Sequence, residues 1–209
     1  MAEMNKIMFN DSFGLTKAVI AETKTMTRRI AYDFRKHTSH MVFRSELLPS
    51  GNITYMDGKQ QVIDELPKPH YKVGEVVAVA QSYKDLLGEE YLPPSIENEI
   101  IALVEADSKG ISNKMFVRAD LMAHYIKMIN YRVERLQDIS DEDCMKEGVI
   151  HYDDVFGEGY MLAEAYNNNY RRHCFTSPRK AFAYLIDKLS GKGTWDSNPY
   201  VHVYEFQKT

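Results

Sequence analysis

Apolar residues recur every three to four positions in two segments of the chain, as they do on one face of a helix. The first segment is 12–22, and the polar residues 10–12 offer side chains that can cap its start. The second segment is 177–193, where Ser177 is a cap residue and Pro178 suits the first turn. The pattern therefore predicts a helix near each end of the chain.

A third, shorter helix is predicted over 138–148 from its boundary residues. Ser140 is a typical N-cap, and Asp143 follows it three positions later, as in a capping box. Gly148 is a typical residue for ending a helix. Glu147 is the last residue before that glycine, and we expect either a solvated surface carboxylate or one turned into a cleft.

Valine-rich and alternating runs predict strands. They cover 71–83, 99–106, 125–136 and 198–206. A hairpin is predicted within ITYMDGKQQV, because Asp57-Gly58 favours a two-residue turn. Strands without regular alternation with helices predict an α+β fold with a small mixed barrel. The 209 residues fit one domain, 1–209, with polar excursions at about 31–70 and 149–176.

Composition narrows the class of protein. Hydrophobic residues make up 44% and charged residues 27%, as in a soluble globule. No apolar run is long enough to cross a membrane and no signal peptide is recognised, so we expect a cytoplasmic protein. Cys144 and Cys174 are expected to be reduced thiols. The net charge of -4 excludes a uniformly basic nucleic-acid binder, so contacts to phosphate must be local, as in 24–29 or 171–180.

No metal or cofactor is predicted. His37 and His40 are three residues apart, but no third ligand lies nearby, so a surface pair is expected. Phosphate-binding glycine motifs are absent from the sequence.

The segment KTMTRR, residues 24–29, has two interpretations. A helix that ends here gains from basic residues near its negative end. Alternatively, Lys24 lies three positions before Thr27 and could activate its hydroxyl, provided that burial lowers the pKa of the lysine. Spacing alone favours the helix end.

Four segments in order resemble the ASCH-domain family, most closely its larger phage and prophage members. They are KTMTRR, YKVGEVVAV, VERLQDISDEDCMKEGV and WDSNPYVHVYEF. The resemblance implies a PUA-like fold, a small β-barrel flanked by helices, with a cleft for RNA, a nucleotide or a modified nucleoside. It is weak over 31–70 and 149–176, which are identified as insertions.

One branch of that family removes the acetyl group from N4-acetylcytidine. Its working residues correspond here to Lys24, Thr27 and Glu147, and the arginine of the motif to Arg29. In the implied amide hydrolysis, Thr27 is the nucleophile, Lys24 its base or oxyanion partner, and Glu147 the proton shuttle. A water nucleophile activated by Glu147, with Lys24 as the electrophile, is the equal alternative.

Ligand contacts are expected from Arg28 and Arg29, because a guanidinium suits both phosphates and bases. Tyr83 is a further candidate, since it ends the strand where larger relatives carry an Arg-Glu-aromatic run. The sequence leaves three functions open: an amidohydrolase, a non-catalytic RNA-binding module and a protein-interaction module. Other candidate aromatic contacts of an RNA-binding module are Tyr125, Tyr131 and Trp195.

Overall fold

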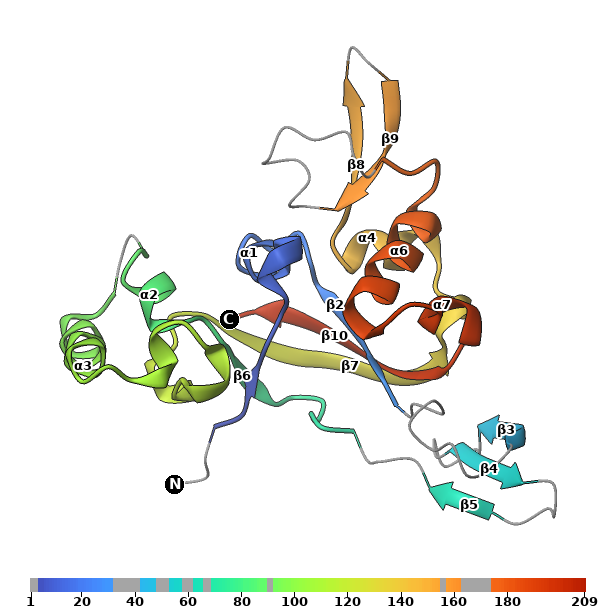
Figure 1. Cartoon of the computed structure of the whole chain (residues 1–209), viewed down its shortest axis with the longest axis horizontal. Coiled ribbons are helices and arrows are strands. Elements are labelled where there is room, and N and C mark those ends of the chain that lie inside the picture. The colour runs from blue at the N-terminus through green and yellow to red at the C-terminus, as the bar shows by residue number, and fades with distance from the viewer. Residues whose placement is uncertain are drawn as a thin grey trace.

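The fold of the chain is α+β and is built on a five-stranded mixed sheet (Figure 1). The computed structural model describes residues 4–31, 42–47, 53–57, 62–65, 69–89, 92–154, 157–162 and 174–209. In spatial order the strands are β1 (Lys6–Ile7), β6 (Val76–Val79), β7 (Tyr125–Arg135), β10 (Tyr200–Lys208) and β2 (Met26–Ile30).

The long strands β7 and β10 form the centre of this sheet. β10 pairs antiparallel with β7 on one side and with β2 on the other, so Val203 lies between Arg28 and Arg132. β1 runs parallel to β6. The two edge strands, β1 and β2, are connected where Arg29 Nη2 on β2 donates to the carbonyl of Met8 at 2.7 Å. The closed barrel of the sequence analysis stays a prediction.

Helices gather at two ends of the sheet, with α4, α6 and α7 beside one end and α2 and α3 beside the other (Figure 1). The α-helices are α1 (Leu15–Ile20), α2 (Tyr83–Leu86), α3 (Pro94–Glu105), α4 (Asp141–Lys146), α6 (Pro178–Ser190) and α7 (Thr194–Ser197). Short 3-10 helices are η1 (Asp11–Phe13), η3 (Lys109–Ile111), η4 (Lys114–Phe116), η5 (Ala119–Leu121) and η6 (Leu136–Asp138). None of the helices in the described ranges is long and apolar enough to cross a membrane.

Two apolar clusters hold these layers together. In the larger one, Phe182 and Leu185 of α6 pack with Val201 and Val203 of β10. The smaller one lies under α2 and α3 and contains Ile100. Helix α4 begins as the sequence predicts, because the Ser140 side chain accepts from Asp143 N at 3.1 Å.

Two smaller sheets stand outside the five-stranded one (Figure 1). The first consists of β3 (Val42–Leu47), β4 (Ile53–Asp57) and β5 (Val62–Glu65). Its strands β4 and β5 pair antiparallel, as the predicted hairpin requires. The predicted two-residue turn at Asp57-Gly58 is wrong, because Asp57 belongs to β4 and Met56 pairs with Val62. Residues 58–61 lie outside the described ones. The second sheet is the hairpin of β8 (Val149–Asp154) and β9 (Gly157–Leu162).

The interpretation of 149–176 as an excursion away from the core is wrong for its first half. Val149 and Leu162 are buried and belong to the main cluster. The strands β8 and β9 therefore begin and end on the core, although the hairpin itself projects from it (Figure 1).

Two predicted elements have a different secondary structure. A strand was predicted over 99–106, but residues 99–105 belong to helix α3, whose first residue Pro94 suits the N-terminal turn. Residues 26–29, which spacing alone placed at a helix end, lie in the edge strand β2. In both cases tertiary packing decided between local preferences that are close in free energy.

The helical assignment of α3 predicts a sharp contrast between two adjacent isoleucines. Ile100 is 0% exposed and Ile101 is 39% exposed. Ile100→Ala should lower the free energy of unfolding by about 2–5 kcal/mol, because it leaves a cavity. Ile101→Ala should change it by no more than about 0.5 kcal/mol. Urea unfolding of both variants measures this, and equal losses would contradict the packing described.

Candidate functional site

A cavity of about 390 Å³ lies against the edge strand β2. Its volume is in the range of small-molecule sites. One wall is polar and comes from β2, the residues before it and the end of α4, and the other is apolar and comes largely from α6. The lining residues are Met8, Phe9, Asn10, Leu15, Lys24, Thr27, Arg28, Arg29, Ile30, Glu147, Phe182, Leu185, Ile186, Leu189 and Ser190. All three predicted catalytic residues are among them.

Lys24 is buried on this wall by the way α1 ends. Its backbone N–H donates to Ala18 O at 3.0 Å, which turns the chain from the helix into β2. Its ammonium group donates to Met26 O at 2.7 Å, to Glu147 O at 2.8 Å and to Glu147 Oε2 at 2.7 Å. These contacts use the three donors of an ammonium group.

Lys24 does stand at a helix end, but the helix is α4 and not its own. Glu147 is the C-cap residue of α4, and its carbonyl accepts from Lys24. A cation there is favourable because the carbonyls at a helix C-terminus carry partial negative charge. The sequence indicated that Lys24 suits the C-terminal end of a helix. In the folded chain that end is at Glu147, which is 123 residues away in the sequence.

Glu147 reaches the cavity because the chain turns directly after it. Gly148 has φ +101°, a conformation that favours glycine. The backbone conformation is the reason for glycine here, because a Cβ would make only ordinary contacts, at 3.4 Å from Leu15 Cδ2 and 3.6 Å from Lys24 Cδ. Glu147 is 4% exposed, so the surface-carboxylate alternative is wrong.

A network of charged side chains lies behind Glu147. Arg28 Nη1 donates to Glu147 Oε1 at 3.1 Å. Arg28 also contacts Glu134 and Asp143, with Nη2 at 2.6 Å from Glu134 Oε1 and 2.9 Å from Asp143 Oδ2. The guanidinium group joins strand β2 to strand β7 and helix α4.

Burial and pairing act in opposite directions on the two cations. Burial lowers the pKa of Lys24, and this outweighs the attraction of Glu147, which raises it. Burial alone would also lower the pKa of Arg28, but the carboxylates of Glu147, Glu134 and Asp143 outweigh it and raise the pKa. Lys24 is therefore the cation that gives up its proton more easily.

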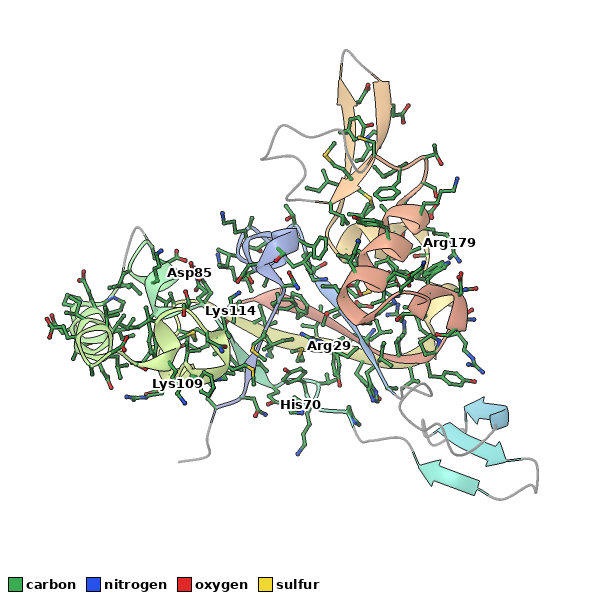
Figure 2. All side chains as sticks on the ribbon, in the orientation of Figure 1. Arg29, His70, Asp85, Lys109, Lys114 and Arg179 are labelled. Carbon is green, nitrogen blue, oxygen red and sulfur yellow. The ribbon has the colours of Figure 1, made fainter. Side chains whose placement is uncertain are left out.

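Thr27 and Arg29 present polar groups to the cavity from the same strand. Thr27 is 5% exposed, and no hydrogen bond joins its hydroxyl to Lys24 or to another described residue. Arg29 is exposed (Figure 2) and lies over the Phe9 ring at 5.9 Å. Within the described ranges it pairs with no carboxylate, so its charge is free to meet an anion.

The two predicted arginine contacts differ in accessibility. Both residues line the cavity, but the side chain of Arg28 is fully buried in the ionic network, so only Arg29 exposes its guanidinium group. Tyr83 is 1% exposed, belongs to the cluster under α3 and is not among the lining residues. Its hydroxyl accepts from Arg118 N at 3.2 Å. We leave Tyr83 out of the site.

The other candidates do not form a second site. Burial raises the pKa of the Cys144 thiol to about 12, which disfavours a thiolate nucleophile. Tyr131 packs on the sheet, with its hydroxyl 2.8 Å from His202 Nδ1. His37 and His40 lie outside the described residues. Across the described ranges, no group of three His, Cys, Asp or Glu side chains is arranged to hold a metal ion.

Sequence reasoning missed the apolar wall and the acidic partners of Arg28. Phe182, Leu185 and Ile186 were predicted as a helix stripe that faces the core, and the same stripe lines the cavity. Glu134 and Asp143 gave no signal beyond ordinary strand and helix positions. A buried arginine needs compensating carboxylates, but a sequence does not show which arginine is buried.

The pKa of Lys24 gives a direct test of this arrangement. The Nζ titration, followed by NMR, should have its midpoint below the ordinary value of 10.5. Glu147→Gln should lower the midpoint further, because it removes an attractive charge. As the unfolded chain keeps this proton up to about 10.5, Lys24 contributes stability that grows as the pH rises toward that value and is lost as the pH falls. A midpoint at or above 10.5 would contradict the burial described.

Comparison of the chain with protein-family models, curated proteins and solved structures found no match. Its function is therefore inferred from the geometry of its own residues and from the motifs of its sequence. The strongest geometric observation is the convergence of Lys24, Thr27 and Glu147 on one partly apolar cavity.

Proposed function

We propose that this chain is a PUA-like, ASCH-type protein that binds a cytosine-containing nucleoside or nucleotide in the cavity and hydrolyses an acyl amide on N4. The observation that carries the proposal is that Lys24, Thr27 and Glu147 line the same cavity. They come from two segments more than 100 residues apart and match the working residues of the amidohydrolase branch that the sequence resembles. The link between β2 and Met8 supports a sheet that curls toward closure.

The two walls of the cavity suit the two parts of such a ligand. A nucleobase is flat and largely apolar on its faces, and the α6 side chains Phe182, Leu185 and Ile186 offer an apolar surface. Its polar edge and the amide need hydrogen-bond partners, which the β2 wall supplies. Arg29 at the exposed side suits a phosphate of a nucleotide or of RNA.

Hydrolysis requires a nucleophile, a proton carrier and stabilisation of the carbonyl oxygen. Glu147 takes the proton of the nucleophile and passes it to the leaving exocyclic amine. In one form of the reaction the nucleophile is a water molecule, which releases acetate directly. In the other it is the Thr27 hydroxyl, and water then hydrolyses the acetyl-threonine ester to release acetate and restore the hydroxyl. Lys24 and Arg28 each donate to one oxygen of Glu147, and these contacts hold the carboxylate at the cavity.

One observation favours the alternative, a module that binds the same ligands without turning them over. The three donors of Lys24 are all used inside the protein, and its Nζ does not bond to the Thr27 hydroxyl. For Lys24 to act as the base of Thr27, it must first lose a proton and exchange one contact. Its lowered pKa works in that direction.

The test is release of cytidine from N4-acetylcytidine by the purified protein. We expect turnover that falls by at least about 100-fold in Glu147→Gln, the loss typical of a proton-transfer group. Thr27→Val should cause a similar loss if threonine is the nucleophile, whereas a retained rate would assign the attack to water. Lys24→Met should also lose activity.

Matched controls lie on the same elements. Thr25→Val removes a hydroxyl from the KTMTRR segment, and Glu142→Gln removes an exposed charge from α4, and neither residue lines the cavity. Both should keep turnover within about twofold, as surface substitutions usually do. Folded wild type that releases no cytidine would overturn the amidohydrolase, and calorimetric binding of cytidine 5′-monophosphate in the same sample would establish the binding module.

A further inference from the structure

Glu147 is held by two cations at once, and each of its carboxylate oxygens has its own donor. Lys24 Nζ donates to Oε2 at 2.7 Å, and Arg28 Nη1 donates to Oε1 at 3.1 Å. One donor on each oxygen fixes the rotation of the carboxylate plane, which a single contact leaves free. The orientation of Glu147 toward the cavity therefore depends on Arg28 as well as on Lys24.

Arg28 is itself fixed from its far side. Its Nε and Nη2 both donate to Glu134 Oε1, at 3.0 and 2.6 Å, and Nη2 also reaches Asp143 Oδ2 at 2.9 Å. Arg132 then holds the same two acids, with Nε 2.7 Å from Glu134 Oε2 and Nη2 bonded to Asp143 Oδ2. The guanidinium of Arg28 has no freedom to follow a moving carboxylate, so it acts as a fixed support.

The side chain of Arg28 is inaccessible to a ligand. It has 0% exposure, and its charge is matched by those of Glu134, Asp143 and Glu147. Arg29, the next residue, is exposed on the same strand and free of carboxylates within the described ranges. Adjacent residues of a strand point to opposite faces of the sheet. Arg28 therefore points into the protein, whereas Arg29 points to the side that a ligand can reach.

We propose that Arg28 is a positioning residue that, together with Lys24, holds the Glu147 carboxylate in the orientation needed for proton transfer in the cavity. The inference rests on the proposed function, because the reaction gives that orientation its use. Arg28 acts through Glu147 and does not touch the substrate.

A positioning role and a merely structural role differ in what they do to Glu147. The titratable groups around this carboxylate are Lys24 before β2, Arg28 on β2 and the neutral Cys144 thiol on its own helix. From α6, Arg179 points to the segment before α4, where it donates to the carbonyls of Ile139 and Gln137 (Figure 2). Loosening Arg28 frees one carboxylate oxygen of Glu147 and should move the NMR signal of its side-chain carboxyl carbon toward that of a solvated glutamate. A purely structural residue would leave that signal in place.

The experiment uses three variants of the full chain and one control. Arg28→Lys keeps the charge but loses the planar fork that reaches several carboxylates. Asp143→Asn weakens the support of Arg28 without altering a lining residue. Arg28→Met removes the charge completely, and it risks misfolding because it leaves buried carboxylates unpaired. Asp141→Asn is the control, since it removes an exposed carboxylate from the first turn of the same helix.

Two properties are measured for each folded protein: the kinetics with N4-acetylcytidine, as kcat and KM, and the NMR signal of the Glu147 side-chain carboxyl carbon at neutral pH. The signal is assigned by its loss in Glu147→Gln. We expect Arg28→Lys and Asp143→Asn to lower kcat by about 10- to 100-fold, the range for a misplaced catalytic group, with KM within about twofold. Both should move the Glu147 signal toward that of a solvated glutamate, and Asp141→Asn should change neither property.

The outcomes separate this proposal from the proposed function. An unmoved Glu147 signal in both Arg28→Lys and Asp143→Asn would overturn the positioning role, whatever the wild type does. A moved signal with an unchanged kcat would also overturn it. A wild type that lacks turnover while the variants move the signal would reject the hydrolase and keep Arg28 as the residue that orients Glu147.

Discussion

The burial of Lys24 beside Glu147 is the interaction on which the rest of the site depends. A lysine that is 2% exposed needs compensation for lost hydration, and here it comes from two carbonyls and a carboxylate. Two of these three acceptors belong to Glu147, so the position of Lys24 fixes both the end of α4 and the direction of its last side chain. Lys24 thereby holds the edge strand β2 against the helix α4, although the two elements are far apart in the sequence.

This lock extends into the sheet through Arg28. Three neighbouring strands each provide a charged residue to the network: Arg28 from β2, Arg132 from β7 and Glu205 from β10. Glu205 Oε1 accepts from Arg132 Nη1 at 2.7 Å. Glu134 and Asp143 connect these strands to α4. Such a network adds little to the free energy of unfolding, because the loss of hydration on burial offsets the attraction between the charges. Removing one member is nevertheless strongly destabilising, because its partners stay buried and charged. Its effect is to define geometry, and the cavity lies where that geometry meets the apolar face of α6.

Several parts of this arrangement could be predicted from sequence because their causes are local. Residues close together in the chain set the Ser140 cap of α4, the long strand predicted over 125–136 and the helix predicted over 177–193. The helix at 94–105 was missed because its apolar residues also fit a buried strand, and only contacts with α2 and β6 in the second cluster decide between them. Lys24, Thr27 and Glu147 could be proposed from motif order, but Arg28 was assigned to the ligand because a sequence does not show which of two adjacent arginines faces inward.

The sequence by itself determined the α+β character, the positions of several helices and strands and the residue types available for chemistry. The tertiary structure alone decided that the last four residues of KTMTRR lie in an edge strand and that Lys24, before the strand, caps a distant helix. It also decided that Arg28 supports a carboxylate while Arg29 faces the cavity, and that Tyr83 is part of the core. The reason is physical: capping and periodicity act over a few residues, whereas burial and ion pairing join groups more than 100 residues apart, and the folded chain sets which groups meet.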